Sequence, residues 1–293
     1  MTKIEKKAIL GIIAMTLVWG GTFPLIKILL SYISPMILLM YRFFFSALLA
    51  IPFFIKGFRK NRKNFLKIIM LGIILYIAYL TQTIGLEYTT SSKSAFITGL
   101  YIIFTPIFAL FFVREKLTRK LVISLILAII GLALLANISL KGFNLNFGDF
   151  ITIISAITFS IQIVLTNIYA QETDIIFIAA TQMIVMFLVG LPFNGNFLQI
   201  SLSPLVLLSL IFLGSFAGFI AILAETYSLK YLDPDRAVIL FTLEPVFAGI
   251  FSFILLHERL SKGGIIGVFL LLVAMCLAAT SKVKKIAEHT VLE

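Results

Sequence analysis

Long apolar runs separated by short polar links dominate the pattern of the chain. Each run is continuously apolar over roughly 20 residues, the length that a helix needs to cross a bilayer. Membrane β-barrel strands would instead alternate apolar and polar positions over about ten residues. The pattern therefore predicts an all-α integral membrane protein with ten transmembrane helices. The predicted helices span residues 8–27, 35–55, 66–86, 94–113, 120–137, 149–169, 176–193, 204–226, 237–256 and 264–280.

Composition supports a membrane protein. Hydrophobic residues make up 61% of the 293 residues, and charged residues make up only 13%. A soluble domain is about half apolar and about a quarter charged. A water-soluble fold of this size could not hide so much apolar surface, so most of it must face membrane lipid or neighbouring helices.

Lysine and arginine gather in alternate links between the apolar runs. With the N-terminus placed in the cytoplasm, 18 of the 24 basic residues fall in cytoplasmic segments and five fall outside. This bias favours a cytoplasmic (inner) membrane location with both termini in the cytoplasm. The net charge of +11 is then a topology signal, and we expect no nucleic-acid partner. The link at 168–175 departs from the bias, because it contains two acidic residues and no basic one.

The two halves of the chain resemble each other. Comparison of 86–118 with 229–261, at an offset of 143 residues, gives eight identities in 33 positions. A unit of five spans is odd in number, so the second copy would cross the membrane in the opposite sense. The sequence therefore predicts two inverted five-helix repeats, at 1–140 and 141–293, with a solute site near the midplane where they meet.

Several short motifs follow one another along the chain in a characteristic order. They are Val18-Trp19-Gly20-Gly21-Thr22-Phe23, Leu86-Glu87-Tyr88-Thr89-Thr90-Ser91, Ala95-Phe96-Ile97-Thr98-Gly99-Leu100-Tyr101, Arg114-Glu115-Lys116-Leu117-Thr118, Leu243-Glu244-Pro245-Val246-Phe247-Ala248 and His257-Glu258-Arg259-Leu260-Ser261. Together they resemble the EamA-type branch of the drug/metabolite transporter superfamily over essentially the whole chain. The resemblance implies ten spans in two repeats and transport of amino acids, other metabolites or amphipathic drugs. The branch is linked to export, and some of its members import.

Arg42 is the one basic residue deep inside a predicted span, about eight residues or roughly 12 Å from its outer end. A charge at this depth is costly and should face a cavity or a partner. Its planar guanidinium suits a carboxylate or phosphate of a substrate. A structural ion pair is the alternative interpretation, and the sequence leaves both open.

Glu244 precedes Pro245 inside the ninth span. A proline removes one helical hydrogen bond, which frees a carbonyl near Leu240 or Phe241. A carboxyl group there could carry a proton or bind an ammonium group, or it could pair with Arg42. Glu225 lies near the inner end of the eighth span and reads more naturally as an interfacial residue.

Polar and aromatic residues at related depths complete a candidate substrate site. Its predicted members are Trp19, Thr22, Arg42, Gln82, Tyr101, Gln162, Gln182 and Glu244. Residues that weaken helices could serve as hinges for alternating access, although small residues also permit close helix packing. The predicted hinges are Gly20, Gly21, Gly99, Pro106 and Pro245.

Signals of an enzyme are weak. The two histidines, His257 and His289, lie outside the predicted spans, and neither an HExxH nor a CxxC motif occurs. A metal site, a catalytic triad and a nucleotide-binding loop are therefore not expected, and no cofactor is predicted.

The sequence thus predicts a secondary transporter that exports a small-molecule substrate across the cell membrane, as a monomer or homodimer. The alternatives are a facilitative importer or a drug efflux protein of the same fold. A membrane-embedded enzyme would need a catalytic polar cluster at one interface, whereas the unusual polar residues lie near mid-depth.

Overall fold

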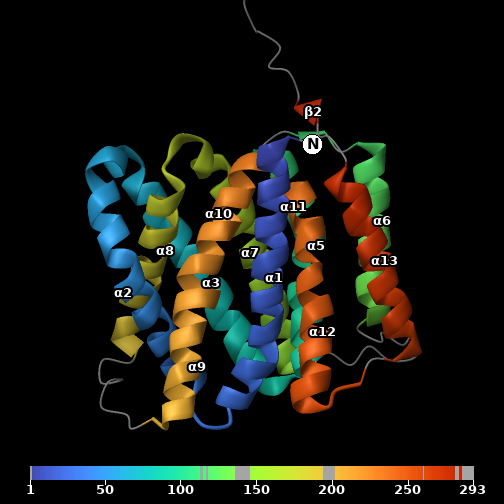
Figure 1. Cartoon of the computed structure of the whole chain (residues 1–293), viewed down its shortest axis with the longest axis horizontal. Coiled ribbons are helices and arrows are strands. Elements are labelled where there is room, and N and C mark those ends of the chain that lie inside the picture. Colours follow the sequence, from blue (N-terminus) through green and yellow to red (C-terminus); the bar gives the residue numbers. More distant parts are fainter. Residues whose placement is uncertain are drawn as a thin grey trace, which may run out of the picture.

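The computed structural model describes residues 2–112, 115–116, 118–135, 146–193, 202–259, 261–280 and 284–285. Its long helices stand side by side in one bundle (Figure 1). Thr2 and the short strand near the C-terminus lie at one end of the bundle, which we call the amino-terminal face. The end that holds Thr89, Lys93 and Asp149 is called the opposite face. The predicted boundary at 140/141 and the basic residues Arg114, Lys141 and Lys282 lie outside the described residues.

Helix-capping residues set where the helices of the first half begin. Thr2 and Glu5 form a capping box at the first helix, while Ser34 and Thr90 cap two later helices through their hydroxyl groups. The elements are α1 (Lys3–Leu29), α2 (Pro35–Asn61), η1 (Arg62–Asn64), α3 (Phe65–Tyr88), α4 (Ser91–Thr98), α5 (Tyr101–Phe112), β1 (Glu115–Lys116) and α6 (Arg119–Leu135).

The second half begins with the same device, because Asn146 and Asp149 form a capping box at its first helix. Its elements are α7 (Phe147–Glu172), α8 (Ile175–Gly190), η2 (Leu191–Phe193), α9 (Pro204–Gly214), η4 (Ser215–Ile220), α10 (Ala221–Tyr231), α11 (Pro234–Phe241), α12 (Leu243–Leu256), α13 (Lys262–Ala279) and β2 (Lys284–Lys285). Strands β1 and β2 pair antiparallel.

Eight helical stretches in the described part of the chain are long and apolar enough to cross a membrane. One of them, Pro35–Tyr88, has 54 residues and joins α2, η1 and α3. A straight helix of that length would measure about 80 Å, against about 30 Å for a bilayer core. Helix α6 has 17 residues, one fewer than the shortest of the eight stretches. The chain is a multi-pass membrane protein.

Two of the predicted spans are broken helices. The span predicted at 94–113 is divided at Gly99 and Leu100, and the span predicted at 237–256 is divided at Thr242. The sequence predicted a helix-weakening residue at the first of these breaks, Gly99, and none at Thr242. Helices α4 and α11 each have eight residues and begin at positions related by the offset of 143. The breaks therefore occur at equivalent positions of the two halves.

The span predicted at 204–226 also departs from a regular α-helix. Its central segment η4 is a π-helix, in which each backbone hydrogen bond reaches one residue further than in an α-helix. The wider turn rotates the residues after it relative to those before it. It therefore helps to decide which side of α10 faces the interior.

Most packing contacts between two helices have a counterpart between the equivalent helices when the two halves are exchanged. Helix α1 packs against α12 and α10, and its counterpart α7 packs against α5 and α3. Helices α2 and α8 pack against each other, as do the counterparts α6 and α13 at one edge of the bundle (Figure 1). Buried apolar clusters fill the space between these helices. The halves thus meet along much of their length.

Candidate functional site

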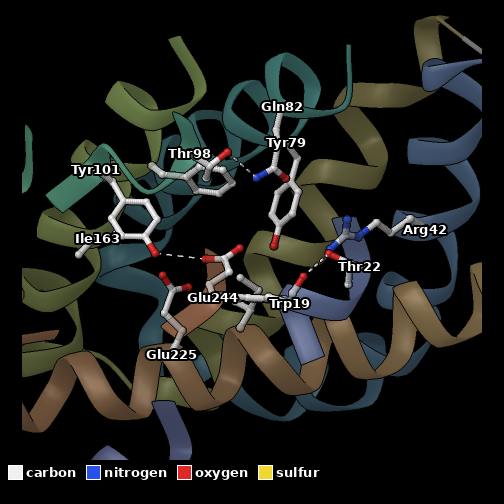
Figure 2. A pocket seen from close by; sticks show the side chains of 12 residues that line it. Trp19, Thr22, Arg42, Tyr79, Gln82, Thr98, Tyr101, Ile163, Glu225 and Glu244 are labelled. Atoms are coloured by element: carbon white, nitrogen blue, oxygen red, sulfur yellow. Dashed lines mark hydrogen bonds between the residues drawn. The ribbon is translucent and has the colours of Figure 1, made fainter. Parts of the chain in front are cut away.

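A small cavity of about 30 Å³ lies in the bundle interior, with room for roughly one water molecule. Figure 2 shows the side chains that surround it. The lining residues are Trp19, Thr22, Arg42, Tyr79, Gln82, Thr98, Tyr101, Phe159, Ile163, Ile222, Glu225 and Glu244. They come from both halves of the chain, so the cavity lies where the halves meet.

Arg42 forms one wall of the cavity and is fully buried, with 1% of its surface exposed. Its guanidinium carbon lies 4.4 Å from the centre of the Tyr79 ring, and Nη2 donates to the Ala217 carbonyl over 3.3 Å. The nitrogens Nε and Nη1 have no hydrogen-bond partner. No carboxylate of the described residues lies within 4.0 Å of the group, so the structural ion pair considered from the sequence is not formed. A buried guanidinium in this state is a ready site for an anion.

The Ala217 carbonyl belongs to the π-helix η4 and serves two donors. Trp19 Nε1 donates to it over 3.0 Å, in addition to Arg42. A π-turn shifts the hydrogen bonding of the backbone, which leaves a carbonyl able to accept from side chains. The irregular segment thereby fixes the orientation of both the indole and the guanidinium.

Glu244 lies on the other side of the cavity from Arg42, close to Tyr101 (Figure 2). Tyr101 Oη lies 3.0 Å from the Phe241 carbonyl and 3.2 Å from Glu244 Oε2. Phe241 is four residues before Pro245, so its carbonyl is the one that this proline deprives of a helical partner. The freed carbonyl predicted from the sequence is therefore present, and Tyr101 satisfies it.

Glu225 also lines the cavity, although the sequence pattern favoured an interfacial place for it. It is buried, with 3% exposed, and its Oε2 lies 3.5 Å from Gln162 Nε2. Gln162 and Gln182 do not line the cavity; they contact each other over 3.3 Å behind Glu225. The interfacial interpretation of Glu225 is therefore wrong, and the structure places the two glutamines one layer further out.

Six of the eight predicted site residues line the cavity. The prediction omitted six others, which are Tyr79, Thr98, Phe159, Ile163, Ile222 and Glu225. The repeat offered a signal for some of them. At the offset of 143, Gln82 corresponds to Glu225 and Tyr101 corresponds to Glu244, and all four face the cavity. Tyr79 and Ile222 form a third such pair.

Comparison with known proteins identifies the family. The EamA-like transporter family matches twice, at residues 6–137 and 146–280. The chain belongs to the EamA-like transporter family. An "Uncharacterized transporter" of Archaeoglobus fulgidus is 31% identical over 92% of this chain and 85% of its own length. An "S-adenosylmethionine uptake transporter" of Rickettsia bellii is 22% identical over 85% of this chain and 84% of its own.

A solved crystal structure shares the fold of this EamA-like transporter. It superimposes with a TM-score of 0.73 at 17% identity and covers 93% of this chain and 96% of the solved one. The family and these relatives establish transport as the function class.

The predicted hinge residues of the transporter have different surroundings. Gly99 lies at the break between α4 and α5, and Pro245 is the third residue of α12, just after the break at Thr242. Helix α1 continues without a break through Gly20 and Gly21, and α5 continues through Pro106. Whether any of these residues acts as a hinge stays a prediction.

Acidic residues of the cavity do not form a metal site on their own. Among the described residues, no group of three or more histidine, cysteine, aspartate or glutamate side chains is placed to hold a metal ion. The cavity offers two carboxyl groups, one guanidinium and an aromatic wall. Such a set can bind a small organic molecule that carries both an anionic and a cationic group.

Proposed function

We propose that the protein is a secondary transporter for a small zwitterionic or amphipathic metabolite, and that Arg42 holds the anionic group of this substrate. The observation that carries the proposal is the unpartnered state of Arg42 Nε and Nη1 in a fully buried side chain. Burial of a charged group without hydrogen bonds is costly, and an anionic ligand would relieve that cost.

The acidic side of the cavity supplies the complementary partner. Glu244 and Glu225 would attract an ammonium or other cationic group of the substrate, while Trp19 and Tyr79 would cover its apolar part. Amino-acid-like and amphipathic metabolites have this combination of groups. We propose export as the physiological direction, because the branch that the sequence resembles is linked to export.

Ten spans in two inverted repeats, at 1–140 and 141–293, would provide the moving parts. Helices α2 and α3 are each long enough to cross the membrane separately, and α6 would be the fifth span of the first repeat. The equivalent helix breaks and the exchangeable packing support this arrangement. A cavity with room for roughly one water must widen to admit a metabolite, so solute passage requires the repeats to move against each other.

Uptake of a sulfonium-bearing substrate is a second candidate. The Rickettsia bellii relative is named as an S-adenosylmethionine uptake transporter. The excess of two carboxyl groups over one guanidinium favours a substrate with net positive charge, and the aromatic wall suits a stacked ring. The substrate panel of the test below therefore includes S-adenosylmethionine.

The test is solute flux in proteoliposomes that contain an internal pH dye, against a panel of amino acids and organic cations. We expect Arg42→Ala to reduce flux of the preferred solute by at least roughly tenfold, since a charge-assisted contact is lost. Arg42→Lys should restore only part of the flux, because an ammonium lacks the planar fork. Arg59→Ala, at an exposed arginine of the same helix, is the matched control.

The same assay decides how transport is driven. A solute-dependent pH change that disappears in Glu244→Gln would assign this carboxyl group to proton coupling. Solute movement without a pH change would mean facilitative transport, with Glu244 as a binding residue. Wild-type flux in Arg42→Ala would contradict the proposed role of Arg42, and absence of flux for every solute would contradict transport of this substrate class.

A further inference from the structure

Two ion pairs lie at opposite faces of the bundle, and each one joins the two halves of the chain. At the opposite face, Lys93 Nζ of α4 lies 2.6 Å from Asp149 Oδ2 of α7. At the amino-terminal face, Arg236 Nη1 of α11 lies 3.2 Å from Glu5 Oε1 of α1. The first pair connects the broken helix of the first half to the second half, and the second pair makes the reverse connection.

The four residues occupy equivalent positions in their helices. Glu5 and Asp149 are each the third residue of a helix, and each completes the capping box of that helix. Lys93 and Arg236 are each the third residue of a broken helix and are related by the offset of 143. The same contact is therefore built twice, once at each face.

Helix stability does not explain the two basic residues. The first turn of a helix presents unpaired N–H groups, so a cation there is unfavourable and an anion is favoured. A carboxylate on the neighbouring helix offsets this, and Asp149 is fully buried in doing so. Each basic residue therefore gains a favourable contact from a carboxylate of the other half.

Further hydrogen bonds between the halves lie near each pair. At the opposite face, Thr89 Oγ1 donates to Asp149 Oδ1 over 2.8 Å. At the amino-terminal face, Ser228 Oγ donates to the Ala8 carbonyl over 2.9 Å, and Arg236 also donates to the Ala279 carbonyl. The cavity lies between the two ends, so a solute must pass one of them to reach it.

We propose that Lys93–Asp149 and Arg236–Glu5 are two repeat-related latches that hold the opposite and amino-terminal faces closed, so that loss of either one opens the cavity toward its own face. The inference rests on the proposed transport by rocking repeats. One member of each pair, Lys93 or Glu5, is partly exposed, so water can solvate that group when the contact breaks in each cycle.

The test measures access to the cavity from each side. Cys276, which is exposed, is first replaced by serine, and Thr22→Cys then provides one thiol in the cavity lining. A membrane-impermeant thiol reagent is applied to right-side-out and inside-out vesicles. An N-terminal tag, tested for protease cleavage in each preparation, identifies which vesicles expose the amino-terminal face.

Opposite changes are expected for the two basic residues. Lys93→Gln should raise the labelling rate from the opposite face by roughly fivefold and lower it from the amino-terminal face, because the equilibrium shifts toward one open state. Arg236→Gln should produce the mirror image. Both substitutions leave Glu5 and Asp149 free to cap their helices.

Matched controls lie beside each latch but within one half. Lys27 Nζ donates to the carbonyls of Leu86, Glu87 and Thr89, and Gln171 Nε2 donates to the Lys230 carbonyl. Because these contacts join helices of the same half, Lys27→Gln and Gln171→Ala should leave the ratio of labelling from the two faces unchanged.

Charge-conserving variants keep the test decisive if a single variant folds poorly. Lys93→Arg and Arg236→Lys preserve each ion pair and should keep the parent ratio. Equal changes at both faces, or no change in Lys93→Gln and Arg236→Gln, would overturn the proposal. Labelling reports conformation and needs no substrate. If the latch variants shift labelling while no solute shows flux, the latch inference holds and the proposed substrate class fails.

Discussion

Arg42 illustrates what a sequence can and cannot predict about one residue. Its depth within an apolar run follows from the chain alone, and so does the need for a polar environment. Its actual neighbours are the Tyr79 ring and the Ala217 carbonyl, which come from two other helices. Their approach depends on the rotation of each helix and on a π-turn, and neither is encoded in a hydrophobic pattern.

Glu225 and Gln162 also show that the sequence does not predict which side chains face the cavity. Both lie in apolar spans, and an apolar span gives a weak indication of which side of a helix faces inward. Gln162 was expected in the lining and lies behind it, while Glu225 was expected at an interface and lines the cavity. The offset that relates Gln82 to Glu225 would have corrected the second assignment.

At the residue scale, Tyr101→Phe tests the link between the broken helices. The hydroxyl contacts both the Phe241 carbonyl and Glu244, so its removal leaves two buried acceptors with one donor fewer. We expect a loss of roughly 1–3 kcal/mol in stability and reduced transport. Thermal unfolding in detergent and flux in proteoliposomes would measure these effects.

Tyr32→Phe is the control for this substitution, because Tyr32 is 70% exposed. It should leave both measurements unchanged. Equal stability of Tyr101→Phe and the wild type would show that the hydroxyl is not needed to hold the break together.

At the element scale, the pattern predicted a weak point at one of the two helix breaks and missed the other. Gly99 was among the predicted hinges and lies at the break of the first half, whereas Pro245 drew attention to the right span but lies three residues after the second break, at Thr242. Continuous apolar character hides such a break, because a short interruption changes few side chains. The alignment of the halves at the offset of 143 matches Gly99 with Thr242. Once the first break is known, the repeat therefore predicts the position of the second.

Close contact between α1 and α12 gives a prediction for adjacent glycines. A Cβ added to Gly20 would lie 2.9 Å from both the Ala248 nitrogen and the Glu244 carbonyl oxygen, which are backbone atoms and cannot rotate away. A Cβ added to Gly21 would meet the Phe251 ring at 3.5 Å, an ordinary contact distance. We expect Gly20→Ala to cost roughly 1–3 kcal/mol of stability.

Gly21→Ala is the matched control, on the same helix and with the same added methyl group. Its unfolding temperature in detergent should stay close to that of the wild type. Similar losses of stability in both variants would mean that the contact between Gly20 and α12 is not the cause.

At the scale of the whole molecule, the charge bias and the structure together predict how the chain is oriented in the membrane. The structure places Thr2 and strand β2 at one end of the bundle, and the distribution of lysine and arginine favours a cytoplasmic location for that end. We expect a fluorescent-protein fusion at either terminus to fluoresce in the cytoplasm, and a phosphatase fused after Tyr32 to be active outside. Phosphatase activity at the C-terminus would contradict this orientation.

The order of the helices and their mutual packing were predictable to different degrees. Each predicted span coincides with helical elements, because a long apolar run in a membrane has few alternatives. Which helices touch across the two halves could not be predicted from runs alone. The contacts of α1 with α12 and of α7 with α5 follow from the symmetry of the halves, which the weak identity signal only indicated.

The unequal chemistry at matched cavity positions has a consequence for how such a protein could arise. Two identical subunits would have to place the same residue at both related positions. Here the first half contributes Gln82 and Tyr101, and the second half contributes Glu225 and Glu244 at the same places. A single fused chain is free of the constraint of identical subunits. Fusion would therefore have allowed the two copies to diverge, one keeping neutral donors and the other gaining acids, around a frame that stayed common to both.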